Sequence, residues 1–204
     1  MYKRQALNTL AGKTSVAVTG SAITTLTGTI SDVNTAYANT SGITGLGNEA
    51  VTISDTTNSG NGVAIAELNT LDDNTTGTVD AGTITVATGT LANLLTAYGS
   101  NGITGLDNEN IVLTDTSVSV TDLNTLDGYT SGTIDASSVT DISGPVSLLN
   151  TAYSSQGIIN LGTAIAVTDT TTSISDINLL DNLSSGIIDT ATITTLTGNS
   201  ASAN

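Results

Sequence analysis

A short motif recurs seven times along the chain, in most copies with an Asn at its centre. It reads LNTL, VNTAY, LNTLD, LLTAY, LNTLD, LNTAY and INLLD, at Leu7–Leu10, Val33–Tyr37, Leu68–Asp72, Leu94–Tyr98, Leu123–Asp127, Leu149–Tyr153 and Ile177–Asp181. Repeat units of this size cannot bury an apolar face alone and do so by stacking on their neighbours. The motif therefore predicts a repeat array.

Two kinds of unit alternate, which we call TLD-type and TAY-type after the residues that end the motif. From each TLD-type unit to the next TAY-type unit the central position moves by a constant step, from 8 to 34, from 69 to 95 and from 124 to 150, whereas the reverse step varies. The longest step contains the polar segment Thr56–Gly62, which is typical of a loop insertion. We predict a single array over residues 6–204, truncated at both ends.

The first five residues, Met1–Gln5 (MYKRQ), do not belong to the motif. They resemble the translation of a transposase adapter used in sequencing libraries, so we expect residues 1–5 to be an artefact of sequencing or assembly. On this interpretation the chain is a fragment, translated from environmental DNA, of a longer protein. The alternative is a genuine basic N-terminus.

Composition excludes several function classes. The chain has no Cys or His, and three Lys and Arg residues against 18 acidic residues give a net charge of −15. Without Cys, neither a disulfide scaffold nor a zinc–thiolate site is expected. Nucleic acids and anionic membranes are disfavoured as partners, because phosphate binding depends on basic side chains. Because the sequence contains no nucleophile–base pair, we expect no enzyme activity and no cofactor.

Each unit predicts a short helix with a side-chain cap. Thr29, Thr90, Ser119 and Ser173 stand at the expected N-caps, and Pro145 takes this place in one unit. Behind each cap, apolar residues follow at i, i+3 and i+6. A helix of about nine residues is marginal in isolation, so packing must hold it.

Two short strands are expected after each helix. In TAY-type units the alternating pairs are Val51/Ile53, Ile111/Leu113 and Ile165/Val167, and in TLD-type units the segments are Gly77–Ala81, Thr83–Thr88, Gly132–Ala136, Val139–Ser143, Gly186–Thr190 and Thr192–Thr197. The spacing of Ile23 and Leu26, and of Ile193 and Leu196, favours a bend or bulge over a straight strand. The fold class expected is an α/β repeat: a solenoid of stacked coils, each a short helix plus two short parallel strands.

One spacing conflict has to be solved by such a stack. Paired strands lie about 4.8 Å apart, whereas packed helices need about 8–10 Å. Either the array curves with the helices on its convex side, or the two unit types place their helices on different faces.

Three side-chain sets are candidate sites. Asp55, Asp115 and Asp169 recur at strand ends, where each is a candidate either to bind calcium or to cap a turn. Turn capping is favoured, because equivalent copies lie too far apart to share one ion. Tyr37, Tyr98 and Tyr153 end equivalent helices as a candidate glycan platform, or as packing residues with the hydroxyl in water. The central Asn residues favour packing or backbone bonding over recognition.

The longest motifs resemble known repeats. TDLNTLDGYTSGTIDASSV at Thr121–Val139 and GITGLGNEAVTISDT at Gly42–Thr56 resemble the Thr/Asp-rich tandem repeats of giant secreted or cell-surface, adhesin-like proteins of marine bacteria, cyanobacteria especially. The segments at Glu67–Asp72 and Asp122–Gly128 also resemble repeats of marine phage tail fibres.

Both resemblances imply an extracellular or cell-surface location and an adhesive or spacer role. The partners then expected are neighbouring repeats of the same chain, together with a surface polysaccharide or another cell. The alternatives are a phage tail-fibre segment and a calcium- or glycan-binding solenoid module. No apolar run approaches the roughly 20 residues that span a bilayer, so no membrane insertion is expected.

Overall fold

The computed structural model describes residues 2–57, 62–162 and 164–198. These residues form an α/β structure with seven short helices, and every strand pairing recorded between them is parallel. The α/β class and the parallel strands are thus as the sequence predicts. The chain divides into two compact units, unit 1 with Met1–Thr88 and Ala92–Glu109, and unit 2 with Gly89–Leu91 and Asn110–Asn204.

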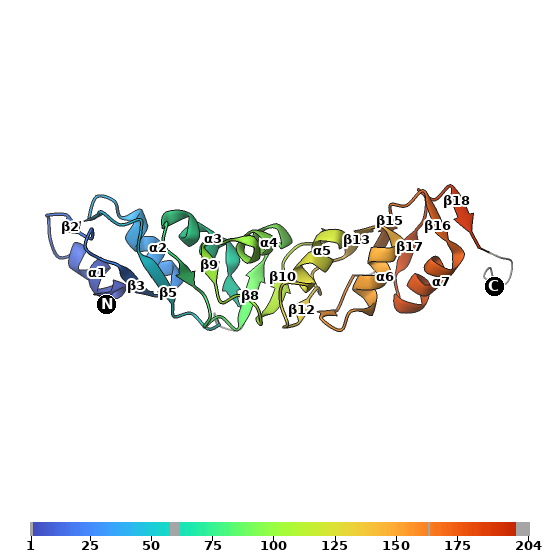
Figure 1. Ribbon diagram of the computed structural model, residues 1–204, viewed down its shortest axis with the longest axis horizontal. Coiled ribbons are helices and arrows are strands. Elements are labelled where there is room, and N and C mark those ends of the chain that lie inside the picture. Colours follow the sequence, from blue (N-terminus) through green and yellow to red (C-terminus); the bar gives the residue numbers. More distant parts are fainter. Residues whose placement is uncertain (1, 58–61, 163, 199–204) are drawn as a thin grey trace. The chain divides into compact units, whose positions relative to one another are not determined.

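Unit 1 holds the elements coloured blue to green in Figure 1. Its helices are α1 (Arg4–Ala11), α2 (Ile30–Ala38), α3 (Ile65–Asn74) and α4 (Leu91–Gly99), the last except for Leu91. Its strands are β1 (Tyr2–Lys3), β2 (Val18–Thr19), β3 (Thr25–Gly28), β4 (Ile43–Thr44), β5 (Ala50–Ile53), β6 (Val63–Ala64), β7 (Val79–Asp80), β8 (Val86–Gly89, the last residue in unit 2) and β9 (Ile103–Thr104). One sheet has the order β1-β3-β5-β7-β9, and β2 pairs with β4 and β6 with β8.

Unit 2 repeats this plan. Its helices are α5 (Val120–Asp127), α6 (Val146–Ser154) and α7 (Ile174–Leu183). Its strands are β10 (Asn110–Leu113), β11 (Ser117–Ser119), β12 (Ile134–Asp135), β13 (Asp141–Gly144), β14 (Ile158–Ile159), β15 (Ala164–Val167), β16 (Thr171–Ser173), β17 (Ile187–Asp189) and β18 (Thr195–Thr197). Within this unit the sheets run β10-β12-β14, β11-β13-β15-β17 and β16-β18.

The core lies between the sheets and the helices of each unit. Alternate strand residues such as Val51, Ile53 and Ile142 point inward and are almost fully buried. They pack against the apolar helix residues that the motif predicts at i, i+3 and i+6. Leu68 and Leu123 belong to this set, and neither is exposed to solvent. Each such side chain contributes about 1.5–3 kcal/mol when it is removed from water. Packing across the repeat therefore holds helices that are too short to persist alone.

The strands are more numerous than the sequence indicates. Two-residue strands follow the TAY-type helices, as β4, β9 and β14, and short strands lead directly into the TLD-type helices, as β6, β11 and β16. Two helices therefore come with five strands, where the sequence suggests four. The expected bend before Leu26 is a turn in which Ile23 N–H donates to the Gly20 carbonyl, and Ile193 N–H likewise donates to the Thr190 carbonyl.

The sheets are interrupted at the same place in each period. The strand before a TLD-type helix begins a new sheet, as β6, β11 and β16 do, and the strand after a TAY-type helix ends one, as β4, β9 and β14 do. The helices still contact their successors, α1 with α2, α2 with α3, α5 with α6 and α6 with α7.

Side-chain capping follows the prediction in part. Thr29 and Ser173 accept hydrogen bonds from the N–H groups of Asp32 and Asp176, as expected for the first and last predicted caps. Thr90 directly precedes α4. Ser119 is the N-cap of α5, but its side chain makes no capping bond there. Pro145 is the N-cap of α6, and its carbonyl accepts the N–H groups at positions 148 and 149.

Two predictions concern the chain's ends and boundaries. Met1 lies outside the described residues, while Tyr2 and Lys3 form β1 beside Leu26 and Thr27 of β3, and α1 begins at the next residue. The backbone of this basic segment is thus part of the first repeat, and its origin as an adapter stays a prediction. Within the array expected over residues 6–204, the main boundary between the two compact units falls between Glu109 and Asn110, and Gly89–Leu91 is also assigned to unit 2.

Candidate functional site

The central Asn residues join one helix to the next. Five of the six central Asn residues donate through their side-chain amide to a backbone carbonyl in the following helix, two positions before the equivalent central residue. The pairs are Asn8 with Asp32, Asn34 with Glu67, Asn69 with Asn93, Asn124 with Leu148 and Asn150 with Asp176, at 2.9–3.1 Å. The Asn ladder therefore makes backbone bonds between repeats, the interpretation favoured over a recognition stripe.

Helix α4 differs from the other helices of this series. Leu95 stands at its central position, and a leucine side chain has no N–H to donate. Its first residue, Leu91, is assigned to unit 2, while the rest of the helix belongs to unit 1. The absence of an Asn amide there removes one helix-to-helix bond from the ladder.

The three candidate calcium ligands cap helices in the preceding repeat. A carboxylate oxygen of Asp55 accepts the N–H of Ile30, the first residue of α2, at 2.8 Å. Asp115 accepts the first N–H of α4 at 2.7 Å, and Asp169 accepts the first N–H of α6 at 2.6 Å. Negative charge at a helix N-terminus is stabilising because free N–H groups and the helix dipole face it. Capping is the role expected from the sequence, although it acts on a helix of the preceding repeat and not on a local turn.

We expect Asp115→Ala to lower the free energy of unfolding by about 1 kcal/mol, the usual cost of losing an N-terminal cap. Urea titration followed by circular dichroism measures the change. The matched control is Asp181→Ala, which removes an exposed carboxylate from α7. Equal stability loss in both variants would show that charge, and not the helix cap, sets the effect.

Two tyrosines are bonded inside the fold to glutamates. The Tyr37 hydroxyl donates to Glu49 Oε2 at 2.9 Å, and the Tyr98 hydroxyl donates to Glu109 Oε2 at 2.8 Å. Glu49 and Glu109 have no solvent-exposed surface, and Tyr37 is 9% exposed. Tyr153 differs, because its hydroxyl donates to a backbone carbonyl, that of residue 162, at 2.6 Å.

These contacts bear on the glycan platform expected from Tyr37, Tyr98 and Tyr153. All three hydroxyls donate hydrogen bonds to acceptors within the chain. The Tyr37 ring has almost no exposed face for a sugar. Sequence reasoning missed the Tyr–Glu pairs, although the segments with Glu49 and Glu109 both follow a TAY motif.

Burial raises the pKa of Tyr153 to about 12, above the value of about 10 for an exposed tyrosine. Burial also raises the pKa of Tyr37, with a further increase from Glu49. Since the folded state favours the neutral phenol, this stabilisation is complete below a pH of about 10 and is lost as pH rises through about 12. We expect the midpoint of urea unfolding to fall over this interval, and Tyr153→Phe to make the decline shallower. An unchanged profile in that variant would contradict the assignment.

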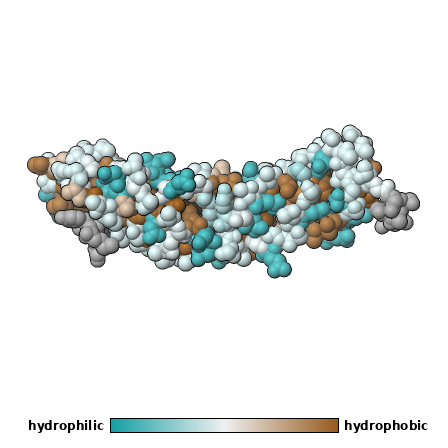
Figure 2. All heavy atoms as spheres, in the orientation of Figure 1, coloured by the Kyte–Doolittle hydropathy of each residue, from teal (hydrophilic) through white to brown (hydrophobic). Residues whose placement is uncertain are grey.

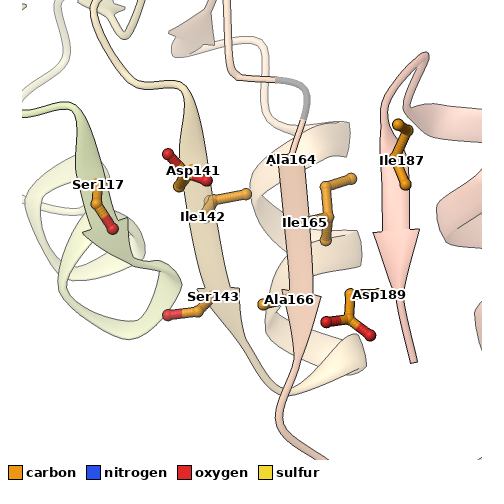
Figure 3. A pocket seen from close by; sticks show the side chains of 9 residues that line it. All are labelled: Ser117, Asp141, Ile142, Ser143, Ala164, Ile165, Ala166, Ile187 and Asp189. Carbon is orange, nitrogen blue, oxygen red and sulfur yellow. The ribbon is translucent and has the colours of Figure 1, made fainter. Parts of the chain in front are cut away.

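A depression lies on the outer face of the sheet β11-β13-β15-β17 (Figure 3). It has a volume of about 360 Å³, and Ala164 and Ala166 of β15 form its floor. Strand register places Asp141 and Ile187 in the row of Ala164, and Ser143 and Asp189 in the row of Ala166. The floor is low because both of these outward residues of β15 are alanines, whereas the matching places of β5 hold an alanine and a threonine.

The depression offers carboxylates and hydroxyls beside an apolar side chain. Asp141 accepts the Thr140 hydroxyl at 2.7 Å, and Asp189 accepts the Ala191 N–H at 2.9 Å, so each carboxylate is oriented by a neighbour. Ile187 is 83% exposed. Hydroxyl groups of a sugar can donate to such carboxylates while its ring packs on the isoleucine.

Acidic residues elsewhere are dispersed. The described ranges contain no group of three or more acidic side chains placed around a single point that could hold a metal ion. Asp135 is oriented by Asn160, whose side-chain amide donates to it at 3.0 Å and holds the pKa of Asp135 below its usual value. A mixture of hydrophilic and intermediate residues, with separate apolar patches, covers the face of the molecule seen in Figure 2.

In comparisons with known proteins, no protein-family model, no curated protein and no solved structure matches the chain. None of the described helices is long and apolar enough to cross a lipid bilayer.

Proposed function

We propose that the chain is a solenoid of stacked repeats and that it serves as a non-catalytic structural and adhesive segment of a large extracellular or cell-surface protein. The observation that carries this proposal is the use of the recurring polar side chains. The motif Asn residues bond helix to helix, and the recurring Asp residues cap helices of the preceding repeat. Side chains repeated for these purposes suit a spacer, in which each repeat contacts only its neighbours.

The acidic composition and the resemblance of the motifs to adhesin-like repeats also support this role. A net charge of −15 keeps a surface protein soluble and disfavours non-specific contact with anionic polymers. Both features suit a segment that works in water outside the cell.

Small-angle X-ray scattering of the chain and of a tandem duplicate tests the stacked architecture. The radius of gyration is expected to grow in near proportion to the number of repeats. A compact protein of the same length would have a radius of gyration of about 17 Å and would grow only slowly on duplication. That second result would contradict the solenoid and, with it, the spacer role.

The depression on the β11-β13-β15-β17 sheet favours glycan binding as a second candidate function. Beads that carry a neutral polysaccharide are expected to retain the chain, and the variant with Asp141→Asn and Asp189→Asn is expected to lose this retention. Thr125→Ala, an exposed change on α5, is the matched control. Equal retention of all three proteins would place the contact elsewhere or show that it is non-specific.

A further inference from the structure

The repeat provides an internal comparison for the depression on the β11-β13-β15-β17 sheet. Strand β15, which forms its floor, is equivalent in the repeat to β5 and β10. The outward residues of β15 are Ala164 and Ala166, whereas Thr52 of β5 and Val112 of β10 occupy the second of these places. The side chain found there in the other two copies is therefore reduced to a methyl group in β15.

Two residues beside the floor also depart from the repeat. Asp141 of β13 stands where β3 has a threonine and β8 a valine, and Ile187 of β17 stands where a threonine directly precedes β7 and β12. Asp189 does not depart from it, because Asp80 and Asp135 occupy the same place and each of the three accepts the N–H two residues later. The repeat thus requires the turn at Asp189 but neither Asp141 nor Ile187, and the place of these two residues beside the alanines points to a local role.

The two carboxylates stand at opposite corners of the depression (Figure 3). Asp141 shares a row with Ala164 and Ile187, and Asp189 shares the next row with Ala166. Two strand spacings across the sheet and two residues along it separate the two aspartates, which corresponds to about 12 Å between their Cα atoms. A ligand with one group at each carboxylate is therefore longer than a single pyranose ring and lies diagonally over the alanines.

The charge of this surface favours a cationic ligand. Asp141 and Asp189 are exposed, and unit 2 contains no Lys, Arg or His to neutralise them. A carboxylate forms shorter and stronger hydrogen bonds with an ammonium group than with a neutral hydroxyl. Together with the exposed Ile187 side chain, the two carboxylates match a ligand that carries ammonium groups on a partly apolar ring framework.

We propose that the depression binds two adjacent units of an amino-sugar polysaccharide. One ammonium group bonds to Asp141 and the other to Asp189, while the sugar rings lie over Ala164, Ala166 and Ile187. The inference rests on the glycan-binding function proposed above and names the class of sugar. It also assigns binding to one place in the array, because β3 and β8 lack the carboxylate of Asp141 and β5 and β10 lack the small side chain of Ala166.

Ionic strength is expected to act on this binding in one direction. The net charge of −15 attracts a cationic sugar over long distances. Added salt screens this attraction, with a Debye length of about 10 Å at 0.1 M and about 3 Å at 1 M. Affinity is therefore expected to fall as salt is added, and an affinity that is unchanged over this range would contradict the ionic contacts.

Titration of the full chain with the β-1,4-linked disaccharide of glucosamine tests the proposal, in a weakly acidic buffer that keeps the amino groups of the sugar protonated. The expected result is a saturable change in the amide NMR signals of residues 141–143, 164–166 and 187–189. The matched ligand is the N-acetylated disaccharide, which has the same rings and no ammonium group. It is expected to bind about 3- to 10-fold more weakly, because two exposed ion pairs are lost.

The remaining outcomes separate this inference from the function on which it rests. Equal affinity for the two disaccharides would refute the amino-sugar class and leave the glycan site in place. The absence of a saturable change with either disaccharide would contradict both. The diamine 1,5-diaminopentane has two ammonium groups and no ring, and if it binds as tightly as the glucosamine disaccharide, the ligand is not a sugar.

Three variants locate the ligand. The variant with Asp141→Asn and Asp189→Asn is expected to bind the glucosamine disaccharide about 3- to 10-fold more weakly. The matched variant with Asp73→Asn and Asp181→Asn loses the same charge at exposed places on α3 and α7 and should keep its affinity. Ala166→Val introduces the side chain that β10 carries, fills the floor without a change of charge, and is expected to abolish binding. Equal losses in the two double variants, or wild-type affinity in Ala166→Val, would refute the site, and circular dichroism verifies that each variant is folded.

Discussion

Replacing Gly77 with alanine is expected to lower the free energy of unfolding of unit 1 by about 3 kcal/mol. A Cβ atom at this position would meet the Glu49 carbonyl group, and it would lie 2.7 Å from the Ala50 nitrogen. Both are backbone atoms of a neighbouring repeat, so neither can turn away as a side-chain end would. The repeats would have to separate, with loss of the Val51–Val79 strand pairing.

Calorimetry measures this effect as a fall in melting temperature of about 10–20 °C for a unit of this size. The matched control is Gly99→Ala at the end of α4, where an added Cβ has no heavy atom within 4 Å. That variant should be neutral or slightly more stable, since alanine favours the helix. If the Gly77→Ala and Gly99→Ala variants have the same melting temperature, the two repeats do not approach each other closely at Gly77.

The second large effect is expected from Tyr37→Phe, a loss of about 2–3 kcal/mol, because the substitution removes a hydrogen-bond donor from a fully buried carboxyl group. Without the hydroxyl, Glu49 keeps the Gly47 N–H as a donor, and its Oε1 atom already has no partner. Tyr153→Phe removes a bond to a neutral carbonyl and should therefore cost less, about 0.5–1.5 kcal/mol. Equal losses from the two substitutions, measured by urea unfolding, would contradict the larger cost expected at the buried carboxyl group of Glu49.

The helices were predictable because their signals are local. A cap such as Thr29 and apolar residues at i, i+3 and i+6 are both contained within one short segment of sequence. Strands β5, β10 and β15 were predictable for the same reason, since a short run with period-two alternation is sufficient. The parallel pairing followed from the repeat itself.

The missed strands are too short to show a period. β4 and β9 each contain one Ile followed by one Thr, and β6 runs directly into α3, so the helix pattern masks it. Two residues become a strand only because the neighbouring repeat supplies hydrogen-bond partners, as the segment around Ile43 does for Val18. That information lies in the next repeat and depends on register.

The candidate site was less predictable for the same physical reason. The capping of α4 by Asp115 could not be predicted from local sequence, because it depends on the strand register that places the carboxylate beside Leu91. The Tyr–Glu pairs carried a usable signal, because Glu49 and Glu109 stand at the same place before β5 and β10 and the third unit has no such residue. The depression around Ala164 depends on which face of β15 is outward, which the alternation with the buried isoleucine does indicate.

The interruption of the sheets has a consequence for how such a chain can change its length. In unit 2 one sheet ends at β14 and another begins at β16, while the sheet β11-β13-β15-β17 continues past both, so the sheets end at staggered positions along the chain. A duplication of two helices and five strands would insert one complete period, with strands for more than one sheet, and leave the flanking pairings in register. Unequal recombination between repeated gene segments would then lengthen or shorten the protein by whole periods. The packing of the surrounding core would stay unchanged.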